Sequence, residues 1–231
     1  MVMWALESIP FIALPKRKVQ TKFTVQTKDL VFISLEQHEK EYAITSKLKK
    51  AVAPDITVLL IPEVTRGAVE TVLAAKKFIN TTDELIISDC DHYFDGDSLY
   101  KTILHRDNLT IGIIPVFQPP DKDPKWSYTL FDTDKTAIAV GEKDAKLAAS
   151  GAYANIGAYY FSEGKIFVEE AEKMINDNDM YGNPGKEEFY VAPLYQRLIK
   201  KGMKVKAAVT PTVWGLGTPK DVELFTKEFT D

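Results

Sequence analysis

ELIISDCDHYFDG, residues 84–96, joins a short apolar run to a pair of acidic residues. The apolar residues 85–87 predict a central strand, and Asp89 and Asp91 follow just past its carboxyl end, the edge at which ligands bind in open α/β sheets. Alternate residues of an extended segment point the same way, so both carboxylates could face one divalent cation, and oxygen ligands suit Mg²⁺ or Mn²⁺. A solvated loop, in which acids are common, also fits the pattern.

The composition predicts a soluble globular protein. The 231 residues are 45% hydrophobic, which is enough to fill a sizeable core. No apolar run approaches the roughly 20 residues of a membrane span, and the N-terminal residues lack the charged start and cleavage site of a secretory signal. The cytoplasm is therefore the expected compartment.

Reactive and charged residues exclude several classes of site. Cys90 is the only cysteine, which excludes an internal disulfide and a multi-cysteine zinc site, and three scattered histidines do not suit a histidine-rich metal site. A net charge of −4, from 29 basic and 33 acidic residues, gives no sign of nucleic-acid binding. The basic run of Lys16, Arg17 and Lys18 fits a solvated loop better than a phosphate-binding patch.

Strands and helices are predicted to alternate in the first half of the chain. The predicted helices cover residues 1–9, 36–51, 67–79 and 97–104, and the predicted strands cover residues 29–35, 56–61, 85–88 and 109–116. This alternation predicts a parallel sheet with helices on both faces.

The second half of the sequence predicts a different order of elements, with antiparallel strands. Residues 118–125 are rich in turn formers, and two alternating segments then predict a hairpin across Asp134 and Lys135, which would be a small antiparallel insertion. After it come a predicted strand at 153–161, helices at 164–176 and 186–200, a strand at 203–209 and a last helix from Pro219. Because no segment resembles a flexible linker, a single domain over residues 1–231 is expected.

Five segments in order along the chain carry a resemblance to a known family. They are EVTRGAVETVLAAKKFI, SDCDHYF, VGEKD, ANIGAYYFSEG and VWGLGTPKDVELF. Together they resemble the sugar-phosphate nucleotidyltransferases, which join a nucleoside triphosphate to a phosphorylated sugar or similar acceptor and release pyrophosphate. The resemblance implies an α/β, Rossmann-like or GT-A-like fold of three layers, with a mostly parallel central sheet, and dependence on Mg²⁺ or Mn²⁺.

One motif of that family is absent. Such proteins begin with a strand and a glycine-rich loop that cradles the triphosphate, whereas this chain begins at a segment that resembles a later helix. Pro15 and Lys16 follow this helix rather than precede it, so the family's lysine is not assigned to Lys16. The simplest interpretation is a missing N-terminal segment, by truncation, a misplaced start or natural loss. Since catalysis of this type depends on positioning and electrostatics, the chain alone is expected to be nearly inactive.

The resemblance assigns the nucleotide side of the site. Asp91 matches the catalytic metal-binding acid, and Asp89 would share the metal or contact the ribose, or else simply end the strand as a hydrogen-bonded acid. Gly67 matches the place where the backbone approaches the nucleobase, with Thr65 and Arg66 beside it. The alternatives are an ordinary glycine at a helix start and a surface charge at Arg66.

The resemblance also assigns the acceptor side. Glu142 and Lys143 match a pair that contacts the acceptor's sugar and phosphate, with Lys143 counted as catalytic, although Asp144 replaces the usual proline. Asn155 and Gly157 match a segment that lines the acceptor pocket, where a strand bulge is the alternative for Gly157.

Six further residues have expected roles in or near the site. Glu187 and Glu188 are predicted to open a helix, where they fit either a contact to the acceptor or, as we favour, complementation of the helix dipole. Gly215 stands where many relatives carry a second metal-binding Asp, and Trp214 is expected in the core or the pocket wall. Cys90 and His92 alternate out of phase with the acids, which favours packing roles.

Two other functions remain open from the sequence. An Asp-any-Asp motif after a strand also occurs in metal-dependent glycosyltransferases that use a nucleotide sugar. A degenerate domain that binds nucleotide sugar without turnover is the third hypothesis. The nucleobase, the acceptor and the oligomeric state stay open, and a homo-oligomer is possible.

Overall fold

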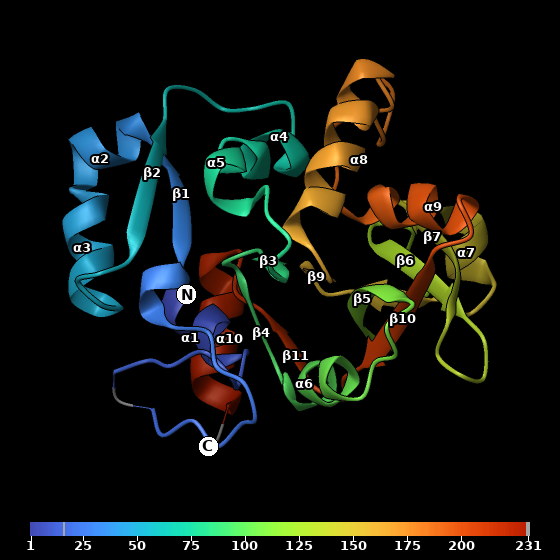
Figure 1. Cartoon of the computed structure of the whole chain (residues 1–231), viewed down its shortest axis with the longest axis horizontal. Helices are drawn as coiled ribbons and strands as arrows, with labels where there is room; N and C mark the ends of the chain where they lie inside the picture. Colours follow the sequence, from blue (N-terminus) through green and yellow to red (C-terminus); the bar gives the residue numbers. More distant parts are fainter. Residues whose placement is uncertain (16, 230–231) are drawn as a thin grey trace.

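A seven-stranded sheet forms the centre of the computed structural model, which describes residues 1–15 and 17–229 (Figure 1). The prediction for Lys16 lies outside the described residues. The strand order is β3-β9-β5-β8-β6-β7, with β10 paired to β5 as well. The bounds are β3 Leu85–Ser88, β5 Thr110–Phe117, β6 Ser127–Phe131, β7 Ala137–Glu142, β8 Tyr153–Asn155, β9 Ala158–Phe161 and β10 Lys204–Val209.

The α/β fold is confirmed, but the sheet is mostly antiparallel, so the prediction of a mostly parallel sheet is wrong. Both β3 and β5 pair antiparallel with β9, which lies between them, and only β10 pairs parallel with β5. The predicted alternation of strands and helices correctly implied that β3 and β5 run in the same direction. It gave no sign that a strand from later in the chain would separate them.

Two small sheets flank the central one. β1 (Val31–Leu35) and β2 (Thr57–Ile61) pair parallel, as the strand-helix-strand pattern predicts. In Figure 1 they lie beside the helices that connect them. β4 (His92–Phe94) and β11 (Val213–Gly215) pair antiparallel and bring the C-terminal motif against the segment that follows β3.

Several predicted helices form at the predicted places, while two are divided. α6 (Asp97–Leu104) and α8 (Gly164–Asn176) match their predictions, and α1 (Val2–Glu7) and α10 (Pro219–Glu228) also form. The helix predicted at 36–51 is interrupted at Ala43, which has a φ of 50°, so that α2 (Glu36–Tyr42) and α3 (Ile44–Ala51) are separate. The helix predicted at 67–79 is likewise two, α4 (Ala68–Leu73) and α5 (Lys76–Ile79).

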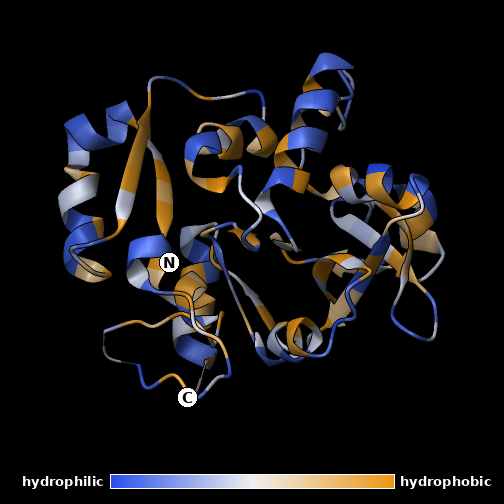
Figure 2. Cartoon of the chain, in the orientation of Figure 1, coloured by the Kyte–Doolittle hydropathy of each residue, from blue (hydrophilic) through white to orange (hydrophobic). Residues whose placement is uncertain are grey.

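The core fills both faces of the central sheet. Neighbouring residues of one strand point to opposite faces. Ile113 and Tyr160 therefore join a cluster with α6, whereas Ile114 and Phe161 join a cluster with α8 and α9 (Ala192–Lys200). Figure 2 shows hydrophobic residues along the strands and hydrophilic ones over much of α2 and α8. The helices and the sheet therefore form three layers, as predicted. A site can lie at the edges of the sheet.

The two ends of the described chain meet through aromatic side chains. Trp4 of α1 packs edge-on against Phe225 of α10, with ring centroids 5.0 Å apart, and Trp214 contacts the same ring at 5.7 Å. This contact confirms a packing role for Trp214. None of the helices in the described ranges has the length and apolar character that a bilayer crossing needs.

Candidate functional site

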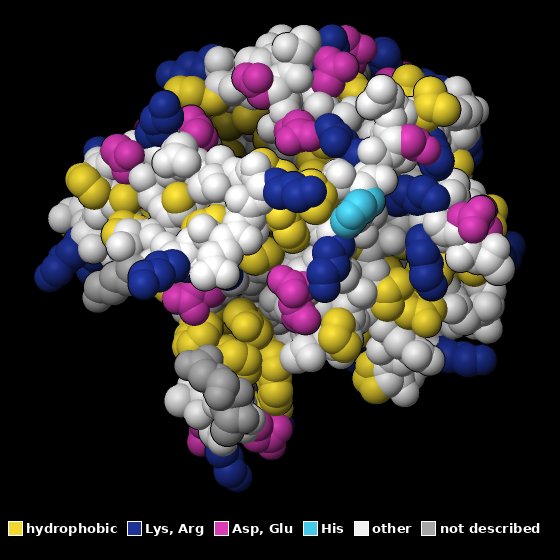
Figure 3. Space-filling view, turned by 60° about the horizontal axis from the view of Figure 1, so that its bottom comes forward, with side chains coloured by type: hydrophobic (Ala, Val, Ile, Leu, Met, Phe, Trp, Pro, Cys, Tyr) yellow, Lys and Arg dark blue, Asp and Glu magenta, His cyan; other side chains and the backbone are white. Residues whose placement is uncertain are grey.

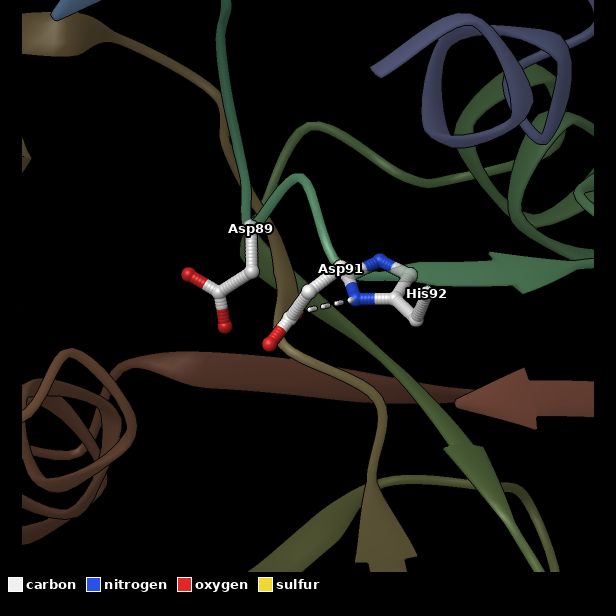
Figure 4. Close-up of side chains that lie close together, drawn as sticks. All are labelled: Asp89, Asp91 and His92. Carbon is white, nitrogen blue, oxygen red and sulfur yellow. Dashed lines mark ion pairs between the residues drawn. The ribbon is translucent and has the colours of Figure 1, made fainter. Parts of the chain in front are cut away.

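Asp89 and Asp91 lie in the loop between β3 and β4, and their carboxylates come together. Ligand atoms of Asp89, Asp91 and His92 all lie within 4.8 Å of one another. Figure 4 shows the two carboxylates side by side, with the His92 ring beside Asp91. The Asp89 backbone N–H donates to the Gly157 carbonyl at 2.9 Å, which continues the β3–β9 pairing and fixes the start of the loop.

Two glycines leave the space that these carboxylates occupy. A Cβ on Gly157 would lie 2.3 Å from Asp89 Oδ2, and the φ of +85° at Gly157 is itself unfavourable for other residues. A Cβ on Gly217 would lie 3.2 Å from Asp91 Oδ2. The Asp89 carboxylate therefore occupies the space beside Gly157 that a side chain there would need.

The two acids differ in electrostatic environment. Both side chains are accessible to solvent, yet surrounding protein desolvates Asp89 and raises its pKa to about 6. His92 Nδ1 lies 3.7 Å from Asp91 Oδ1, and this neighbour holds the pKa of Asp91 below its ordinary value.

The end of β7 carries Glu142 and Lys143 to the same region. Desolvation raises the pKa of Glu142 to about 7, and the negative charges of Glu188 and Asp89 act in the same direction. Lys143 has a φ of 51°, and its Nζ donates to the Tyr190 hydroxyl at 2.8 Å while lying 4.8 Å from the centre of that ring. Tyr190 thus holds the ammonium group in one place.

Thr65, Arg66 and Gly67 form a second group at the start of α4. Arg66 forms an ion pair with Glu70 and lies 5.0 Å from the Phe189 ring centre. The Phe189 N–H donates to the Arg66 carbonyl at 3.0 Å, and the Val69 N–H donates to the Phe189 carbonyl at 2.9 Å. A Cβ on Gly67 would lie 2.5 Å from Phe189 N, so the backbone of Phe189 explains why no side chain fits there.

The Thr65 hydroxyl is used within this second group. It lies 3.0 Å from the Gly67 carbonyl and 2.6 Å from the Thr71 hydroxyl. These two contacts fix the turn into α4.

Residues 188–190 link the two groups, and here the sequence prediction was wrong. α9 begins at Ala192, with proline in its first turn, so Glu187 and Glu188 do not lie at a helix N-terminus. The N–H and C=O of Glu188 bond to Tyr181, and those of Phe189 bond to the start of α4. Because these groups are engaged in tertiary hydrogen bonds, they cannot join a helix.

Asn155 lies at the end of β8, and its side chain is buried. It is 5% exposed, its Oδ1 accepts from the Thr129 hydroxyl at 2.6 Å, and its Nδ2 donates to the Ser127 hydroxyl at 2.9 Å. Its amide therefore ties β8 to β6, directly before the bend at Gly157.

The structure adds residues that the sequence did not assign to the site. His92 is buried, as expected, but its ring approaches the carboxylates, and its Nε2 has no hydrogen-bond partner among the described residues. Cys90 is exposed, so the packing role expected for it is wrong. Tyr190 and Gly217 join the site only through pairing with distant segments. Gly217 lies in the segment VWGLGTPKDVELF, whereas no local pattern marks Tyr190.

The raised pKa of Glu142 gives a prediction about stability. The pKa of Glu142 is higher in the folded chain, at about 7, than its value of 4.5 in the unfolded chain. The stability that the protonated carboxyl contributes is therefore present in full below pH 4.5 and is lost as the pH rises through about 7. We expect Glu142→Gln to remove this loss, so that its stability relative to the native chain rises by about 2 kcal/mol between pH 5 and pH 8. Urea unfolding at both pH values measures it. Glu169→Gln, at an exposed position of α8, is the control and should show no such change.

Comparisons with known proteins agree with this architecture. A model of the nucleotidyl transferase family matches residues 12–214. No curated protein matches the chain in sequence. Among solved structures, the fold is similar to the nucleoside-diphosphate-sugar pyrophosphorylase from Vibrio cholerae RC9, with a TM-score of 0.66 and 18% identity over 86% of this chain and 80% of that chain.

Two further solved structures share the fold. The inositol-1-phosphate CTP transferase from T. maritima has a TM-score of 0.60 and 16% identity, covering 85% of this chain and 75% of that chain. HddC from Yersinia pseudotuberculosis has a TM-score of 0.54 and 19% identity, covering 87% and 78%. Because the family match spans most of the sequence and the fold agrees with it, the chain belongs to the nucleotidyl transferase family.

Proposed function

We propose that this protein transfers a nucleoside monophosphate from a nucleoside triphosphate to a phosphorylated sugar or a similar acceptor and releases pyrophosphate. Family membership supports the reaction class. The observation that carries the proposal is the pair of accessible carboxylates on Asp89 and Asp91, set against Gly157 and Gly217 at the end of β3. The solved relatives named above include proteins described as acting on nucleotides and on phosphorylated acceptors.

The residues present fit a divalent cation. The donor set is two carboxylates close enough to share one ion, and carboxylate oxygens are the ligands that Mg²⁺ and Mn²⁺ prefer. Asp89 forms no salt bridge to Lys or Arg among the described residues, although desolvation makes its negative charge costly. When bound, the ion would supply positive charge to offset the charge that develops on the transferred phosphoryl group.

Lys143 is proposed to bind the phosphate of the acceptor. Its ammonium is a compact cation, and Tyr190 fixes its position through the hydroxyl and the ring face. The hydrogen bond from Lys143 to Tyr190 raises the pKa of the amine, so the cation persists throughout the neutral range. Glu142, which precedes it at the end of β7, would contact the acceptor's hydroxyl groups.

The nucleotide side is proposed to lie along the start of α4. The hydrogen bonds that join Arg66 and Val69 to Phe189 hold the Gly67 backbone in one conformation, which preorganises it to approach a nucleobase edge. Thr65 and Arg66 would flank that base. Asn155 is proposed to hold the Gly157 bend beside the acceptor rather than to bind the acceptor directly, since its amide is engaged by Thr129 and Ser127.

A pyrophosphate-release assay tests this proposal. The native chain is incubated with Mg²⁺, each nucleoside triphosphate and a panel of sugar 1-phosphates. We expect pyrophosphate release that needs both substrates and Mg²⁺. Release of nucleoside diphosphate from a nucleotide sugar would instead indicate a glycosyltransferase. Tight nucleotide-sugar binding that survives Asp91→Ala, without turnover, would indicate a non-catalytic domain.

Gly215 offers a gain-of-function test of the metal site. It pairs with His92 across β11 and β4, it is exposed, and a Cβ there would meet no atom within 4 Å. We expect Gly215→Asp to add a third carboxylate beside Asp91 and to tighten Mn²⁺ binding by roughly tenfold, measured by calorimetry. Gly151→Asp, also in open space, is the control. Unchanged affinity in Gly215→Asp would place the ion away from Asp91.

A further inference from the structure

We propose that a second site, at the sheet edge opposite Asp89, binds a small phosphoryl anion with two or more negative charges, such as inorganic pyrophosphate. β5 begins at Thr110 and β10 begins at Lys204, and both strands run in the same direction as β3. Their first residues therefore lie at the edge away from the carboxyl end of β3. This site is independent of the proposed reaction.

A cavity of about 350 Å³ opens at that edge, and we call it the basic cavity. It lies between the end of α6, the turn of the β6–β7 hairpin and the start of β10. The basic side chains outnumber the acidic ones in its lining, which includes Arg106, Lys135, Lys204, Lys206, Asp107 and Asp134. Figure 3 shows Lys and Arg side chains gathered around a histidine on one face of the molecule.

Two of these cations have no carboxylate partner among the described residues. Lys204 and Arg106 form ion pairs with Asp107 and Glu84. Lys206 instead donates to the Asp134 carbonyl at 2.6 Å, and Lys135 lies 4.6 Å from the centre of the Phe131 ring. A carbonyl and a ring face orient an ammonium group without neutralising it, so two positive charges remain beside the cavity.

The backbone holds these two lysines close to each other. The Ala207 N–H donates to the Lys135 carbonyl at 2.8 Å, and Thr136 forms a bridge with Lys206. These contacts join the turn of the β6–β7 hairpin to β10. The cations therefore come from two segments that the fold fixes together, which reduces the entropy lost when an anion binds both.

Histidine adds a further polar group at the rim. The His105 ring is part of the lining, and its Nδ1 donates to the Lys101 carbonyl at 2.8 Å, which fixes the ring at the end of α6. Compact phosphoryl anions suit such a set, because several point charges from lysine can surround their oxygens. Larger apolar ligands do not suit a cavity lined mainly by charged and polar residues.

The experiment titrates the native chain with inorganic pyrophosphate in EDTA at low salt and follows backbone amide shifts by NMR. We expect shifts centred on Lys135, Lys206 and Arg106, with an affinity that falls as salt is raised. Lys135→Gln combined with Lys206→Gln should weaken binding by about tenfold, and each single variant by about threefold. The matched control is Lys49→Gln combined with Lys50→Gln, which removes the same charge from exposed positions of α3 and should leave the affinity unchanged.

Two results would overturn the proposal. One is native affinity in the folded Lys135 and Lys206 double variant. The other is a set of shifts centred on Asp91 and Lys143, with binding lost in Lys143→Gln, which would place the anion in the candidate active site. If the double variant does not fold, the single variants and the shift pattern still decide the outcome.

Discussion

Replacing Asp91 by Asn is expected to weaken Mn²⁺ binding by at least about tenfold and to reduce pyrophosphate release to background. The amide keeps the size of the side chain but removes the negative charge, and Asp91 is the carboxylate that ionises more readily, since His92 lowers its pKa. Its exposed position and the space beside Gly217 mean that the change costs little folding energy. Loss of binding would therefore report on the ion and not on stability.

Asp89→Asn distinguishes the contribution of the second carboxylate to metal binding from that of Asp91. Desolvation raises the pKa of Asp89, so its amide should be tolerated well in the fold, and Mn²⁺ binding should weaken if the ion is shared. Asp55→Asn, at an exposed turn, is the matched control. Calorimetric titration with Mn²⁺ at pH 7.5 measures all three variants, and native affinity in both Asp91→Asn and Asp89→Asn would exclude a metal at this loop.

Gly67→Ala is expected to lower the free energy of unfolding by about 3 kcal/mol. The φ of +142° is unfavourable for alanine, and its Cβ would lie 2.5 Å and 2.7 Å from the nitrogen and oxygen of Phe189. Because these are backbone atoms, relief requires moving the Phe189 backbone and weakening its hydrogen bonds to Arg66 and Val69. Urea unfolding at pH 7 measures the loss.

The control for Gly67→Ala isolates the cost of the backbone conformation. Gly185 also has a positive φ, of +77°, but a Cβ there would meet nothing within 4 Å. We expect Gly185→Ala to cost about 1 kcal/mol. Equal losses at Gly67 and Gly185 would show that Phe189 moves aside freely and does not preorganise the proposed nucleotide side.

Much of the local structure followed from the sequence because periodicity and turn residues act at short range. The patterns of α6 and α8 gave both bounds correctly, and the hairpin across Asp134 and Lys135 formed where it was predicted. The apolar run before Asp89 became β3, so the acids lie just past its end, as expected. These features depend on residues within a few positions of one another.

Errors arose where distant backbone groups compete for hydrogen bonds. Residues 187–191 have helical spacing, yet Phe189 pairs with the start of α4, and α9 begins only at Ala192. Likewise, residues 153–161 were predicted as one strand but form β8 and β9, and the place of β9 between β3 and β5 depends on a sheet that only the folded chain assembles. Helix and strand propensities carry no information on such partners.

The sequence by itself determined the family, the strand that ends at Asp89 and Asp91, and the residue types suited to a divalent cation and a phosphate. Only the tertiary structure decided that Gly157 and Gly217 make room for those carboxylates, that Tyr190 holds Lys143, and that Phe189 fills the space at Gly67. The physical reason is the range of the interactions. Local sequence fixes backbone preference and charge, whereas close approach and desolvation depend on atoms brought together from distant parts of the chain.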